Sequence, residues 1–169
     1  MSEFFNLPAI ITDKINLSSF TVRQKIEILE WYMKAAINNI GATLGIDDGI
    51  RDGYYFREMT IPKGVLAIGK IHLFEHLFVM IKGDMELATD DFSQRVYATI
   101  DNPFVAVIPG NCKKIVYTYE DSIVATFQKI TVEAADINEA TTENSDLTWV
   151  SKLMEEHGIT EGSIMRIDK

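Results

Sequence analysis

Cysteine is nearly absent from this chain of 169 residues, which has only Cys112. A single cysteine excludes an intrachain disulfide framework, and it is compatible with a reducing compartment. No apolar run approaches the roughly 20 residues needed to cross a bilayer. The first residues, MSEFFNLPAIITDK, also lack the basic start and long apolar core of a signal peptide. We therefore expect a cytoplasmic protein without a membrane partner.

Basic residues are scarce as well. The chain has 16 Lys and Arg against 25 Asp and Glu, which gives a net charge of -9. Binding along a nucleic-acid backbone needs clustered cations, and Lys113-Lys114 is too small a patch. The chain also lacks a nucleophile elbow, a phosphate loop and a dinucleotide fingerprint. We expect no nucleic-acid partner, and the length fits one domain with appended arms.

The N-terminal part combines an arm with a helix. Residues 1–20 are apolar but broken by proline and polar residues, which is typical of an arm lying on a surface. Thr21 and Gln24 have the spacing of a capping box. Apolar residues then recur at helical spacing, and they predict a helix over 22–40 that ends at Gly41.

Two other features lie outside the central region. Trp31 and Tyr32 fall partly off the apolar stripe of the predicted helix, which favours a partner surface and a homo-oligomer. Residues 133–169 are predicted to form a linker, a short helix from Ser145 to about residue 156 and a tail, with Gly158 as the helix stop.

The central part has the pattern of an all-β domain. Residues 41–53 are rich in Gly and Asp and are predicted to be a loop, which completes a segment 21–53. Its acidic residues lack the spacing of a calcium loop. From Tyr54 the hydrophobic period becomes two, which predicts a sandwich or small barrel over 54–132. The expected strands are 54–60, 65–71, 76–82, 84–89, 94–99, 104–108, 113–119 and 122–130.

The stretch Gly69–Gly83 carries the candidate site. It contains His72 and His76, with Glu75 between them. Residues of like parity share a face of a strand. One face then holds His76, Phe78 and Met80, and the other holds Leu77, Val79 and Ile81. Because both faces are apolar, the pattern predicts a strand buried between two layers, and a histidine opening it indicates a lined cavity.

Two motifs give the region a family resemblance. The first cupin motif has a glycine, a His-x-His pair, a glutamate and a strand ending in glycine, and Gly69, His72, His76 and Gly83 match its frame. Pro103–Gly110 matches the lead-in to the second motif. Residues 57–130 therefore resemble a cupin domain, and they are most similar to small bacteriophage-encoded cupin-like proteins of unassigned function. The resemblance implies a cupin-like jelly roll, here with an N-terminal helix and a short C-terminal helix, located in the host cytoplasm or the virion.

The chain departs from the cupin pattern at its metal positions. His76 stands in the place of the usual metal-binding glutamate, and His72 in that of the second histidine of the pair. Lys70 and Lys114 stand where the resemblance leads us to expect histidines. Only two of the four metal positions therefore keep a ligand.

Three interpretations of the site stay open. In the first, the region binds a small polar or anionic ligand, with imidazole donors, lysine charge and apolar walls. The residues expected to bind it are Lys70, His72, His76, Phe78, Met80, Lys114 and Tyr117. In the second, a divalent metal is held by His72, His76 and Glu75, although strand parity directs Glu75 away and lysine repels a cation. In the third, the histidines are a hydrogen-bonded structural pair.

These interpretations correspond to different classes of function. The favoured one is non-enzymatic binding or sequestration of a small ligand, with no cofactor. The alternative is a virion-associated or assembly protein whose terminal extensions contact other phage proteins. A metal-dependent cupin enzyme is the third. Cys112 is expected to be a structural thiol, since no histidine lies near it in sequence.

Overall fold

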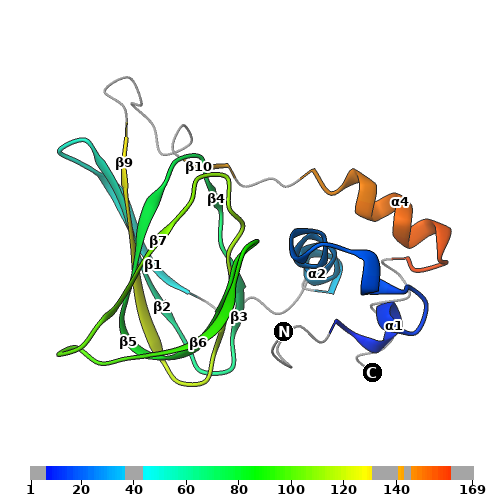
Figure 1. The fold of residues 1–169 in the computed structure, drawn as a ribbon, viewed down its shortest axis with the longest axis horizontal. Helices are drawn as coiled ribbons and strands as arrows, with labels where there is room; N and C mark the ends of the chain where they lie inside the picture. Colours follow the sequence, from blue (N-terminus) through cyan, green and yellow to red (C-terminus); the bar gives the residue numbers. More distant parts are fainter. Residues whose placement is uncertain (1–6, 37–43, 131–140, 143–145, 161–169) are drawn as a thin grey trace. The chain divides into compact units, whose positions relative to one another are not determined.

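The computed structural model describes residues 7–36, 44–130, 141–142 and 146–160 (Figure 1). The chain divides into two compact units. One consists of Met1–Gly41 with Asn144–Lys169, and the other of Ala42–Glu143. We call them the helical unit and the β unit. None of the helices in the described ranges is long and apolar enough to span a membrane.

The helical unit begins as the sequence predicts. Its described elements are α1 (Ala9–Thr12), a 3-10 helix (Leu17–Ser19), α2 (Val22–Ala36) and α4 (Thr148–Glu156). The capping box of α2 is confirmed, because the Gln24 N–H donates to Thr21 Oγ1 at 3.2 Å and the Thr21 N–H donates to Gln24 Oε1 at 2.9 Å. The predicted helix is present through Ala36, and residues 37–40 lie outside the described ranges.

Helices α2 and α4 are joined by two tryptophans. The indole N–H of Trp31 donates to Ser151 Oγ at 3.1 Å, and that of Trp149 donates to Glu27 Oε2 at 3.0 Å. Trp31 is only 9% exposed. The expectation that Trp31 faces a partner is therefore wrong, because α4 of the same chain covers it.

The C-terminal end of α4 lies where the sequence predicts it, whereas the predicted residue at its start cannot be compared. The predicted cap, Ser145, lies outside the described residues, and the Asp146 carboxylate accepts from the Thr148 N–H at 3.0 Å. Gly158 has a φ of +66°, and the Ile159 N–H donates to the Met154 carbonyl at 2.8 Å. This left-handed glycine ends the helix, as predicted.

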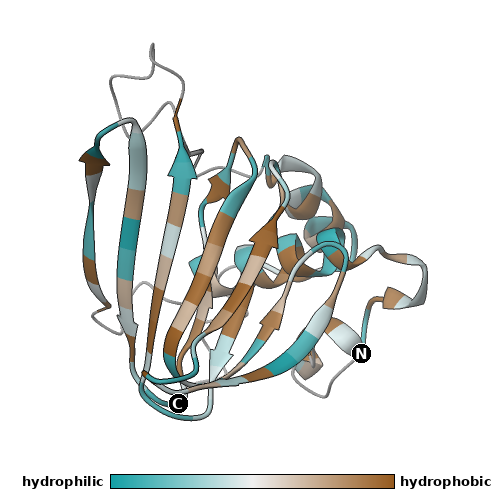
Figure 2. Ribbon diagram, turned by 60° about the vertical axis from the view of Figure 1, so that its left-hand side comes forward, coloured by the Kyte–Doolittle hydropathy of each residue, from teal (hydrophilic) through white to brown (hydrophobic). Residues whose placement is uncertain are grey.

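The β unit contains a curled eight-stranded antiparallel sheet and a separate two-stranded sheet that consists of β4 and β10 (Figures 1 and 2). Its strands are β1 (Gly45–Arg51), β2 (Tyr54–Ile61), β3 (Leu66–Ile68), β4 (Ile71–His72), β5 (His76–Ala88), β6 (Ser93–Ala98), β7 (Phe104–Ile108), β8 (Ile115–Thr118), β9 (Ser122–Lys129) and β10 (Thr141–Thr142). Strand β5 is the hub, since it pairs with β6, β7, β8 and β9. The predicted all-β fold with an N-terminal helix and a short C-terminal helix is confirmed, and it is consistent with a cupin-like jelly roll.

Three local predictions are wrong. The expected strand 65–71 is divided into β3 and β4, which belong to different sheets. Residues 45–51, expected as a loop, form β1. This strand pairs with β2, and Asp52 and Gly53 form the turn between the two strands. Both turn residues have positive φ, 52° and 78°, so the Gly- and Asp-rich composition encodes a tight hairpin turn. The third error concerns Gly83, which was expected to separate two strands but lies inside β5.

Glycine is required inside β5 because two strands approach closely there. Gly83 has a φ of +124°, and a Cβ on it would lie 2.8 Å from the Cα of Ser122 in β9. The register against β9 also shifts between Met80 and Lys82. The glycine thus allows a bend and a bulge rather than ending the strand.

Alternate residues of β5 face opposite sides of the sheet as expected, but only one of the two faces is buried. His76, Phe78 and Met80 are all buried and share the inner face. The opposite face was predicted to be buried too, yet Leu77 is exposed and Val79 is half-buried. The sheet therefore has a packed inner face and an outer face that stays accessible among the described residues. Figure 2 shows apolar residues recurring along neighbouring strands of the sheet.

Candidate functional site

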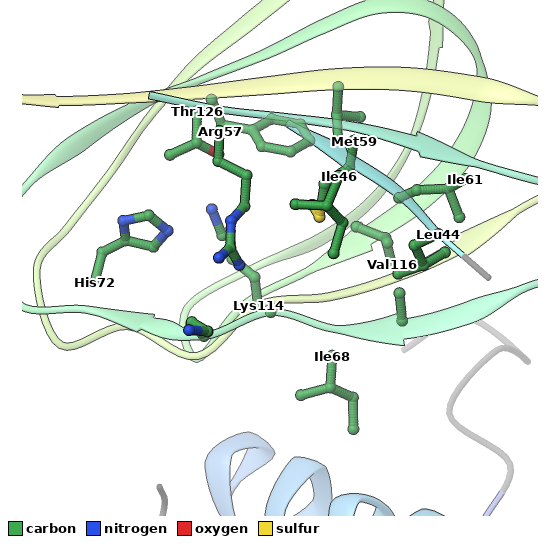
Figure 3. A pocket seen from close by; sticks show the side chains of 15 residues that line it. Leu44, Ile46, Arg57, Met59, Ile61, Ile68, His72, Lys114, Val116 and Thr126 are labelled. Atoms are coloured by element: carbon green, nitrogen blue, oxygen red, sulfur yellow. The ribbon is translucent and has the colours of Figure 1, made fainter. Parts of the chain in front are cut away.

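The inner face of the β unit encloses a cavity of about 220 Å³. Its polar lining consists of Arg57, Lys70, His72, Lys114 and Thr126, and its apolar lining includes Leu44, Ile46, Met59, Ile61, Phe78, Val116 and Val124. No Asp or Glu is among the described residues that line it. The polar groups gather at one end and the aliphatic side chains at the other (Figure 3).

The turn Pro109–Asn111 brings the separated parts of the polar end together. A Cβ on Gly110 would lie 2.7 Å from the Leu73 carbonyl oxygen, so glycine lets this turn pack directly on that backbone. The Asn111 N–H donates to the His72 carbonyl at 2.7 Å. This contact places the segment that carries Lys114 beside the two histidines.

The hydrogen bonds define the protonation of both imidazoles. His76 Nδ1 lies 3.2 Å from the Phe74 carbonyl oxygen, so Nδ1 carries the proton because a carbonyl only accepts. His76 Nε2 is then an acceptor for Lys114 Nζ, which lies 2.8 Å away. His72 Nδ1 donates to Gln128 Oε1 at 2.9 Å. The two rings stack with centroids 4.0 Å apart.

Burial sets the charges of this cluster. Burial first, and then the Lys114 charge, lowers the pKa of both His72 and His76 to about 3. Burial also lowers the pKa of Lys114 to about 7. Both imidazoles are therefore neutral near pH 7, while Lys114 is divided between its amine and ammonium forms.

Arg57 is fixed on the opposite wall by an acidic neighbour. Its Nη2 and Nε lie 2.5 and 3.0 Å from Asp48 Oδ2. Burial raises the pKa of Tyr55 to about 12, so its hydroxyl stays protonated and can donate to the same carboxylate oxygen at 3.4 Å. One edge of the guanidinium is thereby occupied by Asp48, and its other N–H groups are donors for a ligand.

Arg57 lies in β2, within the predicted strand 54–60, but the sequence did not indicate it as a site residue because β1, which carries Asp48, was expected to be a loop. Asp48 pairs directly with Arg57 in the β1–β2 register. Had the Asp52-Gly53 turn been recognised, cross-strand pairing would have placed these opposite charges together. The predicted cavity thus lacked its strongest anion-binding group.

The structure brings together some of the predicted ligand-binding residues. Those that line the cavity are Lys70, His72, Phe78 and Lys114. His76 lies behind the lining, in contact with Lys114 and His72, and Met80 is part of the core. Tyr117 lies outside the lining residues, with its ring edge-on to that of Tyr119 at 5.1 Å between centroids.

The residues present do not fit the metal centre implied by the cupin resemblance. Glu75 is exposed, so it does not join the two buried histidines. His76 Nε2 is occupied by Lys114, and Lys114 and Arg57 add positive charge where a cation would bind. The described part of the chain has no cluster of three or more His, Cys, Asp or Glu suited to a metal ion. A ligand set of His72, His76 and Glu75 therefore does not assemble.

Comparison with known proteins gives likenesses only at the level of structure. No family model matches the sequence, and no curated protein matches it. A cupin superfamily protein from Desulfitobacterium hafniense superposes with a TM-score of 0.45 and 10% identity, over 56% of this chain and 84% of that one. An RmlC-like cupin from Shewanella frigidimarina gives 0.45 and 13%, over 56% and 83%.

An enzyme is also among the similar structures. A DMSP lyase from Ruegeria pomeroyi superposes with a TM-score of 0.47 and 14% identity, over 57% of this chain and 54% of that one. Scores below 0.5 at such identities carry no argument about function. The resemblance to phage-encoded proteins stays a prediction.

Proposed function

We propose that the β unit binds a small carboxylate with an apolar tail, without a resident metal. The cavity supports this function because it joins three cationic side chains to an aliphatic end and has no acidic lining residue. Small-molecule sites usually combine apolar walls with a few convergent polar groups. The cavity is below the typical ~300 Å³, which favours a compact molecule.

Charge balance favours an anion at the polar end. Both histidines are neutral near pH 7, so the positive charge of the lining comes from Arg57, Lys70 and the ammonium form of Lys114. Asp48 offsets the charge of Arg57 from behind. The ammonium form of Lys114 is costly to bury, and a ligand carboxylate would offset its charge. Arg57 would bind that carboxylate through N–H groups, with the Thr126 hydroxyl beside it.

Replacing Arg57 tests this proposal. We expect Arg57→Met to weaken binding of hexanoate at least tenfold, because a charge-assisted hydrogen bond contributes about 1.5–3 kcal/mol. Isothermal titration calorimetry at pH 7 measures it, and adding EDTA should leave the wild-type affinity unchanged. Arg51→Met is the matched control, since Arg51 lies in the same hairpin but is exposed. Failure of the wild type to bind short carboxylates, or an equal loss in both variants, would contradict the proposal.

Self-association is the second candidate function, and the outer face of the sheet favours it. Leu77 pairs with Val107 on one side and Phe127 on the other, and Phe127 pairs with Phe56. Val107 is 58% exposed and Phe127 is 44% exposed. These four residues form an uncharged row on a chain of net charge -9. Such a row suits a second copy of this chain, because two identical apolar rows can face each other about a twofold axis.

A charge placed in this row tests the oligomer. We expect the wild type to be a dimer and Val107→Asp to shift it toward the 19.1 kDa monomer, because a buried unpaired carboxylate opposes association. Multi-angle light scattering at micromolar concentration measures the mass. Gln94→Asp adds the same charge at an exposed site in β6 and should leave the mass unchanged. A wild type that is monomeric at every concentration would count against self-association.

A further inference from the structure

Lys114 combines burial with an unusual set of partners. The residue is 6% exposed, and its side chain lines the cavity. Its Nζ lies 2.8 Å from His76 Nε2 and 5.2 Å from the centre of the Phe78 ring. Within the described ranges, none of the ion pairs involves Lys114. A buried lysine held by an imidazole and an aromatic ring, without a carboxylate, has the surroundings of an amine nucleophile.

We propose that Lys114 forms a reversible imine with the carbonyl carbon of a small 2-oxo acid bound in the cavity. This inference rests on the proposed function, because the ligand carboxylate is held by Arg57 as described above. In a 2-oxo acid the carbonyl adjoins the carboxylate, and both groups would lie at the polar end of the cavity. The hydrocarbon tail would extend along the aliphatic end (Figure 3).

The hydrogen bond to His76 provides a route for the protons. The amine lone pair attacks the carbonyl carbon, a C–N bond forms, and the π electrons of the C=O bond move to oxygen. His76 Nε2, already within 2.8 Å of Nζ, accepts a proton from the nitrogen. The imidazolium returns that proton to the oxygen, which gives a hydroxyl group on the carbon. His76 Nε2 then transfers the second N–H proton to this hydroxyl as the C–O bond breaks, so the oxygen leaves as water with both amine protons and the neutral C=N bond forms. No oxidant or reductant is needed.

The groups around Lys114 favour its neutral form. His76, His72, Arg57 and Cys112 face it from the surrounding segments. Burial chiefly, and then the Arg57 charge, lowers its pKa to about 7, while Cys112 acts in the opposite direction. An exposed lysine, with a pKa near 10.4, has only about one amine in a few thousand side chains at pH 7. Once Lys114 loses its charge, one cause of the lowered pKa of His76 also disappears.

Trapping with a reductant tests the imine in the full-length wild-type protein. The protein is incubated with 2-oxohexanoate and sodium cyanoborohydride at pH 7, and hydride reduction makes the link permanent. Each modified chain should gain the mass of the acid less one oxygen atom. Peptide mapping should find the adduct on Lys114 at least ~100-fold in excess over exposed Lys129, because an exposed lysine has about a thousandfold less neutral amine at pH 7 than Lys114. Hexanoate, which has no ketone, should block the labelling, and Lys114→Met should remove it.

The outcomes separate the imine from carboxylate binding. Selective labelling of Lys114 that hexanoate blocks supports the imine. If hexanoate and 2-oxohexanoate both bind but labelling at Lys114 does not exceed that at Lys129, the imine is overturned and carboxylate binding stands. If neither acid binds, both proposals are overturned. Peptide mapping of the wild type gives these results even if Lys114→Met fails to fold.

Discussion

We expect Lys114→Met to make the protein more stable at pH 7, although it removes a hydrogen bond from the site. Burial lowers the pKa of Lys114 from 10.5 to about 7. The unfolded chain therefore binds a proton between pH 7 and 10.5 that the folded chain does not, so the wild type becomes more stable as the pH rises through this window. Below pH 7 the buried Lys114 is charged, and it destabilises the folded state by its full amount.

The size of the effect follows from this linkage. At pH 7 the buried lysine destabilises the fold by about 4 kcal/mol, and loss of the partner of His76 Nε2 costs about 1–3 kcal/mol. A net gain of about 1–3 kcal/mol is expected at pH 7. At pH 9 the lysine destabilises by about 2 kcal/mol, so the advantage of the variant should nearly vanish. Urea unfolding at the two pH values measures the difference.

A matched substitution isolates the burial. Lys129→Met removes an exposed lysine from β9 and should give the same small stability change at pH 7 and pH 9. If Lys114→Met also showed no pH-dependent difference from the wild type, Lys114 would be fully charged in the fold. That result would remove the electrostatic support for an amine nucleophile in the cavity.

The two histidines make the stability of the fold depend on pH in the acid range. Burial lowers the pKa of His72 and His76 from 6.5 to about 3. The unfolded chain binds protons between pH 6.5 and 3 that the folded chain does not, so stability falls as the pH drops through that range. The Lys114 charge contributes to the lowered pKa of both histidines. Lys114→Met should therefore also reduce the loss of stability at acid pH.

The sequence predicted the inner face of the fold well because that face obeys simple periodicity. Strand parity alone placed His76, Phe78 and Met80 together, and all three are buried. The Thr21–Gln24 capping box forms for an equally local reason, since two residues three positions apart suffice to define it. These are the features for which sequence spacing and spatial neighbourhood coincide.

The outer face and the polar end of the cavity were not predictable in the same way. Whether Leu77 is covered depends on what packs over the sheet, which the period of one strand does not encode. The approach of Arg57 to Asp48 depends on the register of a hairpin, and the stacking of His72 on His76 depends on the bend between β4 and β5. The Asp52-Gly53 turn sets the register of the hairpin, and its composition is compatible with a loop as well as with a tight turn.

Gly110→Ala is expected to damage both the fold and the site. An added Cβ would lie 2.7 Å from the Leu73 carbonyl oxygen and 3.0 Å from the Phe74 carbonyl carbon. Both are backbone atoms, so no side chain can rotate away, and overpacking of this kind costs about 1–3 kcal/mol. To relieve the clash, the turn must move away from the backbone that follows β4. This movement would lengthen the hydrogen bond from the Asn111 N–H to the His72 carbonyl and shift Lys114 relative to His76.

The binding measurement distinguishes this local displacement from general unfolding. We expect folded Gly110→Ala to bind hexanoate at least several-fold more weakly than the wild type, in addition to its lower urea midpoint. Gly45→Ala is the control, because its Cβ would meet only the Thr60 side chain, at 3.5 Å. It should change stability by at most about 1 kcal/mol, in either direction. Wild-type stability and affinity in Gly110→Ala would show that the turn does not position Lys114, since a turn able to move freely cannot hold the amine against His76.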